Sequence, residues 1–417
     1  MARQGVSGRL TATYLAELPP DRAVAAAEAF ATGQSIGTWL PVPGITADMR
    51  RRYGAVVEEV RPEPMPEEVG GEPIGGRWLM RIRFPAVNFG DEIPMLLTTL
   101  VGNDPSTSLT VRLVDIDLPA RWTSAFPGPR LGVAGWRRIT GVPGRPLLLN
   151  MIKPCTGFTP EVGAGLAEQV ARGGVDLIKD DELLADPSFS PVAARARAYA
   201  RRLDAVAGET GHRARYIANV TTRPLRLVET ARAALEAGAD AVMVNGLATG
   251  LDGVRTLAEA GLGAPILVHT TTSEVLTGGT GSGIGQAVLF GKLLRMAGAD
   301  AVFTSTPHGH RPLPAGVFGT TVDWLLERRG GLRPAMPMLA GGVTADHIAP
   351  LIARAGTDVM LGIGGAIQGH PDGATAGARA MRAAIDAALA GEHANRSGGT
   401  GHPADRDPDE GRQRRRG

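Results

Sequence analysis

The sequence is poor in cysteine and lysine, and it lacks long apolar runs. Cys155 is the single cysteine among 417 residues, so an intrachain disulfide is excluded. No stretch approaches the roughly 18 consecutive apolar residues of a membrane-spanning helix, and residues 1–10 lack a signal-peptide core. The formal net charge of +2 favours neither a nucleic-acid partner nor an acidic membrane surface. These absences predict a cytoplasmic protein without nucleic-acid or membrane partners.

The scarcity of lysine is informative in itself. Of the 44 Lys and Arg residues only three are lysine, namely Lys153, Lys179 and Lys292. Since arginine supplies plain positive charge elsewhere, the lysines are candidates for chemistry that arginine cannot perform. A buried ammonium group can lose its proton, whereas a guanidinium group in effect cannot. We expect such chemistry from Lys153 and Lys179, and a surface position without chemistry for Lys292, which lies on a predicted helix.

Short apolar, β-branched runs alternate with helical stretches rich in Ala, Arg and Glu from residue 146 to about residue 390. Gly, Pro or Asp residues bound the runs, as is typical of buried parallel strands. The eight runs are residues 146–153, 175–181, 215–220, 241–246, 265–270, 301–306, 336–342 and 359–365. This repeat predicts an α/β fold, a TIM (β/α)8 barrel. A doubly wound open sheet is the alternative, but it rarely needs eight such units.

The first third of the chain follows another pattern. Strand-like runs at residues 52–60, 77–84 and 109–116 are mixed with helix-like runs at 21–31 and 92–101. This pattern predicts a smaller α+β (ferredoxin-like) domain with a mostly antiparallel sheet. We expect this domain over residues 1–140 and the barrel over 141–390, with a connection at 127–144. A disordered tail is expected over 391–417, where apolar residues are almost absent.

The candidate chemistry lies at the ends of the predicted barrel strands, where TIM barrels place their active sites. The second run ends in Lys179-Asp180-Asp181-Glu182. A lysine beside three carboxylates is unfavourable unless something organises the charge, and Mg²⁺ prefers carboxylate oxygens. The motif therefore predicts a Mg²⁺ site, the alternative being a solvated acidic turn before a helix. The glycine pairs after the last two runs suggest a phosphate site, because backbone N–H groups can approach an anion there.

Several motifs together carry a family resemblance. In chain order they are Gly37-Thr38-Trp39, Val101-Gly102-Asn103, Ile152-Lys153-Pro154, the segment from Gly174 to Glu182, Gly341-Gly342, and Gly364-Gly365 with Gly369-His370-Pro371. By their order and spacing over residues 30–390, the chain resembles the large subunit of RuBisCO and its non-carboxylating type IV relatives, the RuBisCO-like proteins.

The resemblance implies a set of site residues. Lys179 would be carbamylated by CO₂ and would bind Mg²⁺ together with Asp181 and Glu182. Lys153 would act as an acid or base, and His269 would contact the substrate. Asn103 would complete the site of a neighbouring subunit, which implies at least a homodimer. The phosphate-binding residues would be Thr38, Trp39, Gly342, Gly364 and Gly365.

The departures from the family pattern argue against carboxylation of ribulose bisphosphate. Residues of the carboxylases that grip a second phosphate or handle CO₂ are replaced at Gly33, Cys155, Thr270, Phe303, His310 and Ala340. A bisphosphate would leave one phosphate without cationic partners, a penalty of several kcal/mol. Cys155 itself is interpreted as a small buried hydrophobe rather than a nucleophile.

The remaining groups suffice to form and protonate an enediolate. We expect a Mg²⁺-dependent lyase or isomerase that acts on a phosphorylated keto-sugar or keto-sugar-acid. The reaction would be the decarboxylation or hydrolysis of an oxo sugar-acid phosphate, or an isomerisation or enolisation. The alternative within the family is a methylthio-sugar-phosphate enolase of methionine salvage; the lysine expected in the first domain of those enolases is absent from residues 1–152. Two alternatives belong to other classes of protein. One is a catalytically silent binding or regulatory homologue, and the other is an aldolase-like barrel that forms a Schiff base on Lys153.

Overall fold

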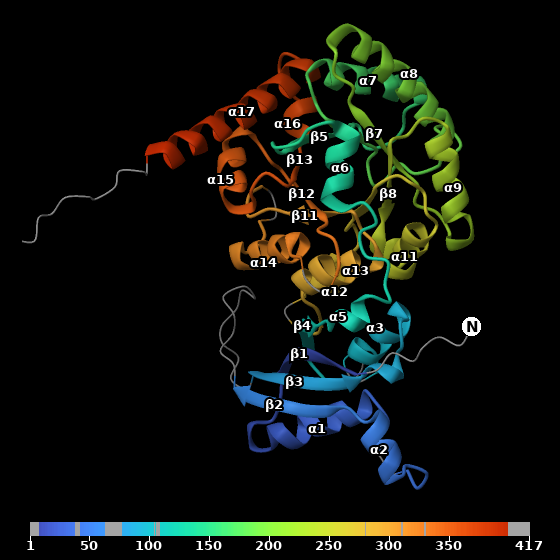
Figure 1. Cartoon of the computed structure of the whole chain (residues 1–417), viewed down its shortest axis with the longest axis vertical. Helices are drawn as coiled ribbons and strands as arrows, with labels where there is room; N and C mark the ends of the chain where they lie inside the picture. The colour runs from blue at the N-terminus through green and yellow to red at the C-terminus, as the bar shows by residue number, and fades with distance from the viewer. Residues whose placement is uncertain are drawn as a thin grey trace, which may run out of the picture.

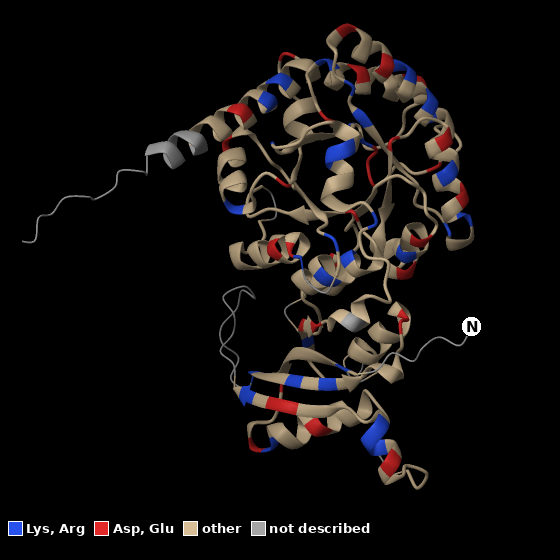
Figure 2. Ribbon diagram, viewed as in Figure 1, with Lys and Arg blue, Asp and Glu red and all other residues tan. Residues whose placement is uncertain are grey.

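The computed structural model describes residues 8–37, 42–62, 77–103, 105, 109–279, 281–309, 312–328 and 331–398. A small sheet domain lies below a larger barrel along the long axis of the molecule (Figure 1). Charged residues of both signs follow the outer helices of the barrel (Figure 2). Among the helices within these ranges, none combines the length and apolar character needed to cross a bilayer.

The N-terminal domain is a ferredoxin-like α+β unit, as predicted. Its sheet has the strand order β10-β4-β1-β3-β2, where β10 (Gly283–Ile284) comes from the later part of the chain. Strand β1 is antiparallel to β3 and β4, as β2 is to β3. The elements are β1 (Arg9–Glu17), α1 (Ala23–Gly33), α2 (Ala47–Tyr53), β2 (Val56–Pro62), β3 (Arg77–Pro85), α3 (Ile93–Val101) and β4 (Val111–Asp117). The central strand β1 was missed, because its small residues Thr and Ala weaken the apolar pattern although most of the strand is buried.

The eight predicted barrel strands are all present and form a closed parallel barrel. They are β5 (Leu147–Met151), β6 (Leu177–Lys179), β7 (Arg215–Asn219), β8 (Ala241–Asn245), β9 (Ile266–His269), β11 (Ala301–Ser305), β12 (Met336–Ala340) and β13 (Met360–Gly362). Inward-facing side chains such as Leu149, Ile217, Met243 and Met338 fill the barrel as one buried cluster. The interior is therefore a packed core, and chemistry is confined to the strand ends.

Helices surround the barrel between the strands. The principal ones are α7 (Pro160–Arg172), α8 (Val192–Thr210), α9 (Pro224–Glu236), α11 (Leu251–Glu259), α14 (Ala315–Leu326), α15 (Ala345–Ala355) and α17 (Ala374–Gly398). Thr159 begins α7, where its hydroxyl oxygen accepts from the Val162 N–H. The last helix α17 runs beyond residue 390, where we expected the tail to begin, and the remaining residues 399–417 lie outside the described ranges.

The segment predicted as an interdomain connection contains a helix, α6 (Gly132–Thr140). Trp136 on this helix is fully buried and belongs to the cluster inside the barrel. Asp300 fixes the start of the helix, because its Oδ1 accepts from the backbone N–H groups of Leu131 at 2.7 Å and Gly132 at 2.6 Å. The connection is therefore part of the barrel core rather than an independent linker.

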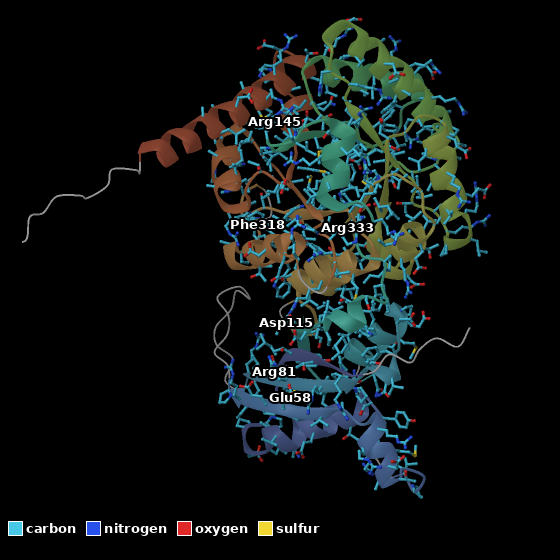
Figure 3. All side chains as sticks on the ribbon, in the orientation of Figure 1. Glu58, Arg81, Asp115, Arg145, Phe318 and Arg333 are labelled. Atoms are coloured by element: carbon cyan, nitrogen blue, oxygen red, sulfur yellow. The ribbon has the colours of Figure 1, made fainter. Side chains whose placement is uncertain are left out.

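Lys292 joins the two domains, so our expectation of a surface position was wrong. Its Nζ lies 2.5 Å from Asp115 Oδ1, donates to the carbonyl oxygen of Ile116 at 2.7 Å, and lies 3.9 Å from the Trp324 ring centroid. Asp115 lies between the sheet and the barrel (Figure 3). Lys292 belongs to a π-helical segment, η4 (Val288–Leu294), a rare geometry that often marks functional regions. The short strand β10 (Gly283–Ile284) also pairs with β4 across the junction.

Candidate active site

Five of the predicted site residues meet at the face of the barrel formed by the C-terminal ends of its strands. Lys179 ends β6, and its Nζ lies 3.5 Å from Glu182 Oε2. Lys153 follows β5 and donates from Nζ to Asp181 Oδ2 at 2.6 Å. His269 ends β9, with Nε2 3.4 Å from Glu182 Oε2. Two lysines, two carboxylates and one imidazole thus form a connected cluster.

The two lysines of this cluster have different environments. Lys179 is fully buried, and burial lowers its pKa although Glu182 and Asp181 act in the opposite direction. The Lys153 side chain is 38% exposed. Burial acts to lower the pKa of Lys153, but its hydrogen bonds with Asp181 and Cys155 outweigh that effect and raise the pKa. Lys153 is therefore the cation of the cluster, and Lys179 is the amine that loses a proton more readily.

His269 is held in one tautomer. Its Nδ1 lies 3.1 Å from the backbone nitrogen of Thr271, which carries a hydrogen, so Nδ1 accepts and Nε2 bears the proton of the neutral ring. Burial, followed by the charge of Lys179, keeps the pKa of His269 well below its ordinary range. The ring therefore presents an N–H donor toward Glu182.

A buried ion pair supports the segment that carries the carboxylates. Asp180 and Arg195 are both fully buried, and Arg195 Nε and Nη2 donate to the two Asp180 oxygens at 3.0 and 2.8 Å. The Tyr216 hydroxyl and the Asn219 N–H also donate to Asp180 Oδ2, at 2.7 and 2.9 Å. Asp180 consequently points away from the cluster, while its neighbours Lys179 and Asp181 point into it. Sequence reasoning missed Arg195, which looks like an ordinary position of a helix rich in arginine.

Two asparagines at neighbouring strand ends hold the backbone of the carboxylate segment. Asn219 Nδ2 donates to the carbonyl oxygens of Asp181 at 3.1 Å and Glu182 at 3.3 Å, and Asn245 Nδ2 donates to that of Glu182 at 3.0 Å. Asn245 Oδ1 is buried and has no hydrogen-bond partner within the described residues. The position of Asn245 at the end of a predicted strand could have identified it from the sequence.

The predicted phosphate-binding glycines lie at the ends of β12 and β13. A Cβ atom on Gly364 would lie 2.8 Å from Met151 Cγ, so that Met151 would have to shift, and 3.6 Å from Lys153 Cε, an ordinary contact that places Gly364 beside Lys153. Gly342 has a φ of +94°, a left-handed conformation that favours glycine. A Cβ on Gly365 would meet no atom within 4 Å, which leaves open space beside the backbone.

Three other predicted residues do not join the cluster within the described chain. Thr38 and Trp39 lie outside the described residues. Asn103 follows α3 in the N-terminal domain, where its Nδ2 donates to the carbonyl oxygen of Gly33 at 3.3 Å. Its expected role in the site of a neighbouring copy stays a prediction.

The donor atoms of the cluster suit a hard divalent cation. Asp181 and Glu182 offer carboxylate oxygens, which Mg²⁺ prefers, and Asn245, whose Oδ1 has no partner among the described residues, is bound through Nδ2 to the same segment. Within the described ranges, no group of three His, Cys, Asp or Glu side chains is placed to hold a metal ion. A third anionic ligand at this place can come from Lys179, once that amine carries a carboxylate.

The barrel mouth opens beside His269 into a cavity of about 330 Å³, lined by Thr270, Ser273, Phe303 and Ser305 among others. The Phe303 ring centroid lies 4.4 Å from that of His269. None of the described residues that line the cavity is a lysine or arginine. The replacements at Thr270 and Phe303 therefore leave this wall without cations among the described residues, where a second phosphate would need them.

Comparison with known proteins identifies the family. The model of the ribulose bisphosphate carboxylase large chain, catalytic domain, matches residues 132–311 and 319–406. The chain belongs to the RuBisCO large-chain family. A RuBisCO-like protein of Archaeoglobus fulgidus is 39% identical over 366 residues, 87% of this chain and 84% of the relative.

Relatives outside the carboxylases place the chain among the RuBisCO-like members of this family. The 2,3-diketo-5-methylthiopentyl-1-phosphate enolase of Geobacillus thermodenitrificans is 36% identical over 369 residues, 88% of this chain and 89% of the relative. The crystal structure of a RuBisCO-like protein (MtnW) from Alicyclobacillus acidocaldarius has a TM-score of 0.83 and 32% identity, covering 92% of this chain and 94% of that chain. The protein is thus a RuBisCO-like enzyme, as the resemblance predicted.

Proposed function

We propose that this RuBisCO-like enzyme is a Mg²⁺-dependent isomerase that enolises a phosphorylated keto-sugar derivative and does not carboxylate ribulose bisphosphate. The observation that carries the proposal is the asymmetry of the barrel mouth. Lys153 and Gly364 lie together on one side, whereas the described residues that line the cavity beside His269 include neither lysine nor arginine. Such a site accepts one phosphate and an uncharged opposite end.

The metal would be held by Asp181, Glu182 and a carbamate on Lys179. CO₂ adds to the neutral Lys179 amine, an N–C bond forms, and one proton is released. Burial of this amine and its 3.5 Å separation from Glu182 support the assignment. When bound, Mg²⁺ supplies Lewis-acid stabilisation of negative charge on substrate oxygens.

The residues of the chain divide the proton transfers between them. A proton leaves the carbon next to the substrate carbonyl, and the carbonyl oxygen gains a proton, so that the enol forms without loss of atoms. A carbamate oxygen on Lys179 is the base, because His269 already bears its proton on the nitrogen that faces the cluster. The Lys153 ammonium stabilises the developing oxyanion, and His269 Nε2–H orients a substrate oxygen.

The relatives favour enolisation over the decarboxylation of a sugar-acid phosphate. The lysine expected in the first domain of the salvage enolases is absent here, yet proteins named 2,3-diketo-5-methylthiopentyl-1-phosphate enolase are as much as 36% identical to this chain. The substrate that we propose is accordingly a 2,3-diketone 1-phosphate whose far end carries no charge.

Exchange of substrate hydrogen with solvent tests this proposal. In D₂O with Mg²⁺ and bicarbonate, we expect deuterium at the carbon between the phosphate ester and the diketone, together with ultraviolet absorbance of the enol. Lys153→Met should lower kcat by about 10²–10⁴-fold, the usual contribution of a general acid or base. Arg197→Met is the control, since it replaces a cation at an exposed position of α8, outside the cluster. Absence of exchange with every diketone phosphate tested would refute the enolase assignment.

We also propose a homodimer in which Asn103 of one copy completes the site of the other. Large apolar side chains after three barrel strands support a partner at the mouth: Leu183 is 69% exposed, Leu225 97% and Val275 87%. A mixture of the Asn103→Ala and Lys179→Met variants should regain activity through hybrid dimers. In each hybrid dimer one of the two sites combines an unchanged Lys179 with an unchanged Asn103. Sedimentation at the mass of a monomer, or mixtures no more active than their components, would contradict the arrangement.

A further inference from the structure

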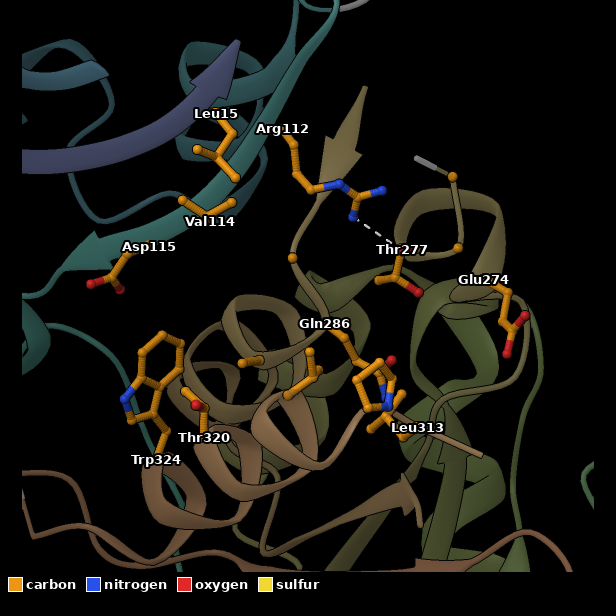
Figure 4. A pocket seen from close by; sticks show the side chains of 16 residues that line it. Leu15, Arg112, Val114, Asp115, Glu274, Thr277, Gln286, Leu313, Thr320 and Trp324 are labelled. Atoms are coloured by element: carbon orange, nitrogen blue, oxygen red, sulfur yellow. Dashed lines mark hydrogen bonds between the residues drawn. The ribbon is translucent and has the colours of Figure 1, made fainter. Parts of the chain in front are cut away.

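A second cavity of about 520 Å³ lies between the N-terminal sheet and the barrel (Figure 4). One wall comes from β1 and β4 through Leu15 and Val114, and the opposite wall comes from α14 through Val317, Thr320 and Trp324. We name this cavity the junction chamber. Asp115 and Trp324 lie at one end of it, and Glu274 and Leu313 lie at the other (Figure 4).

The junction chamber adjoins the cavity at the barrel mouth. Glu274, Thr277 and Gln286 line both of them. The mouth cavity begins at His269, which belongs to the catalytic cluster. The two cavities therefore adjoin at Gln286, on the side of the mouth cavity that faces Trp324.

Most charges of the chamber are engaged by the protein, although Arg112 Nε is buried without a partner among the described residues, and much of the remaining lining is apolar. Arg112 Nη1 donates to the carbonyl oxygens of Thr277 at 3.1 Å and Ile284 at 3.3 Å. Asp115 Oδ1 is bound by Lys292, whose Nζ also lies over the Trp324 ring. The carboxylate of Glu274 at the entrance disfavours an anionic group by repulsion. The lining thus suits an uncharged chain with apolar and aromatic contacts.

We infer that the junction chamber binds the uncharged distal end of the substrate, and that it selects diketone phosphates with an apolar chain of several carbon or sulfur atoms. The inference rests on the proposed enolase function, which places the phosphate beside Lys153 and the diketone at the cluster. The mouth cavity takes the first part of the chain, and the chamber takes the remainder.

A chain-length series tests the inference on the full-length enzyme. The probes are 2,3-diketone 1-phosphates that end in one, three or six additional carbons. We expect KM to fall about three-fold for each buried methylene while kcat stays constant. Val317→Phe should fill the chamber, raising KM for the longest compound at least ten-fold and leaving that for the shortest unchanged. Ala315→Phe is the matched control, because Ala315 is exposed at the start of the same helix and does not line the chamber.

Thr320→Phe, which fills the chamber from the next turn of α14, replaces Val317→Phe if that variant does not fold. Equal KM values along the series, or equal effects of Val317→Phe and Ala315→Phe on KM, would overturn the role of the chamber. Turnover of these compounds would still support the enolase function. If no compound reacts, calorimetric titration separates the two ideas. Binding that tightens with chain length and weakens in Val317→Phe then supports the chamber without the enolase, and binding independent of chain length overturns both.

Discussion

Lys179→Met is expected to reduce kcat/KM for a 2,3-diketone 1-phosphate by about 10³-fold or more. Methionine fills nearly the same buried space as Lys179, which is fully buried at the end of β6, but it cannot carry a carbamate. The variant therefore loses an anionic metal ligand and leaves Asp181 and Glu182 as the carboxylates facing the metal. A factor of ten in rate corresponds to about 1.4 kcal/mol, so a 10³-fold decrease corresponds to the loss of several kcal/mol of stabilisation by the metal.

Three measurements locate the cause of the loss. Calorimetric titration with Mg²⁺ in the presence of bicarbonate should give heat with the parent enzyme and none with Lys179→Met. Carbon-13 NMR with labelled bicarbonate should show a carbamate resonance that disappears in the variant. Lys292→Met carries the same chemical change at a lysine bound to Asp115, and it should keep the resonance and the heat. A resonance that persists in Lys179→Met would assign the carbamate elsewhere, and full activity would reject the metal site.

The barrel could be predicted because its strands carry their own signal. A parallel strand buried on both faces needs a continuous apolar run, and runs such as that of β8 (Ala241–Asn245) are buried at every residue. In β1 the inward positions include Ala12 and Ala16, whose small side chains give a weak pattern. The helix α6 escaped prediction because glycine and proline around it are typical of loops, and only the tertiary contact of Trp136 explains its burial.

The catalytic cluster was predictable because one short motif contributes three of its members. Lys179, Asp181 and Glu182 are adjacent in sequence, so the position of one strand end places them all. The contacts of Lys153 with Asp181 depend on neighbouring strands and followed once the barrel order was known. In contrast, Lys292 lies on a helix whose environment is set by the N-terminal sheet, and no local pattern reveals that partner.

The motif contains three carboxylates, and their different environments explain how it works. Asp181 and Glu182 face Lys153, Lys179 and His269, whereas Asp180 is bound by Arg195 on the opposite side. Alternation along the extended segment places one acidic residue behind the strand and its neighbours at the mouth. The Asp180–Arg195 pair behind the strand thus fixes the direction in which Lys179 and Asp181 point, so that Arg195 would be a positioning residue for the proposed metal ligands.

Arg195→Met is expected to lower the free energy of unfolding by about 3–5 kcal/mol, because it leaves Asp180 as an uncompensated buried charge. Arg195 also donates to the carbonyl oxygens of Ala185 at 2.6 Å and Ser190 at 2.5 Å, so the loop after Glu182 loses two further bonds. Urea unfolding measures the loss. Arg197→Met, at an exposed position of the same helix, should change the free energy by less than about 0.5 kcal/mol.

The double variant Asp180→Leu/Arg195→Met separates charge from packing. Replacing both members of a buried pair removes the uncompensated charge, so the double variant should be more stable than Arg195→Met alone, with a coupling energy of about 1–3 kcal/mol. If Arg195 positions the ligands, neither variant restores tight Mg²⁺ binding, and the affinity stays about 10–100-fold below that of the parent enzyme. A double variant that regains stability and also binds Mg²⁺ normally would show that the pair stabilises the fold without orienting Lys179, Asp181 and Glu182.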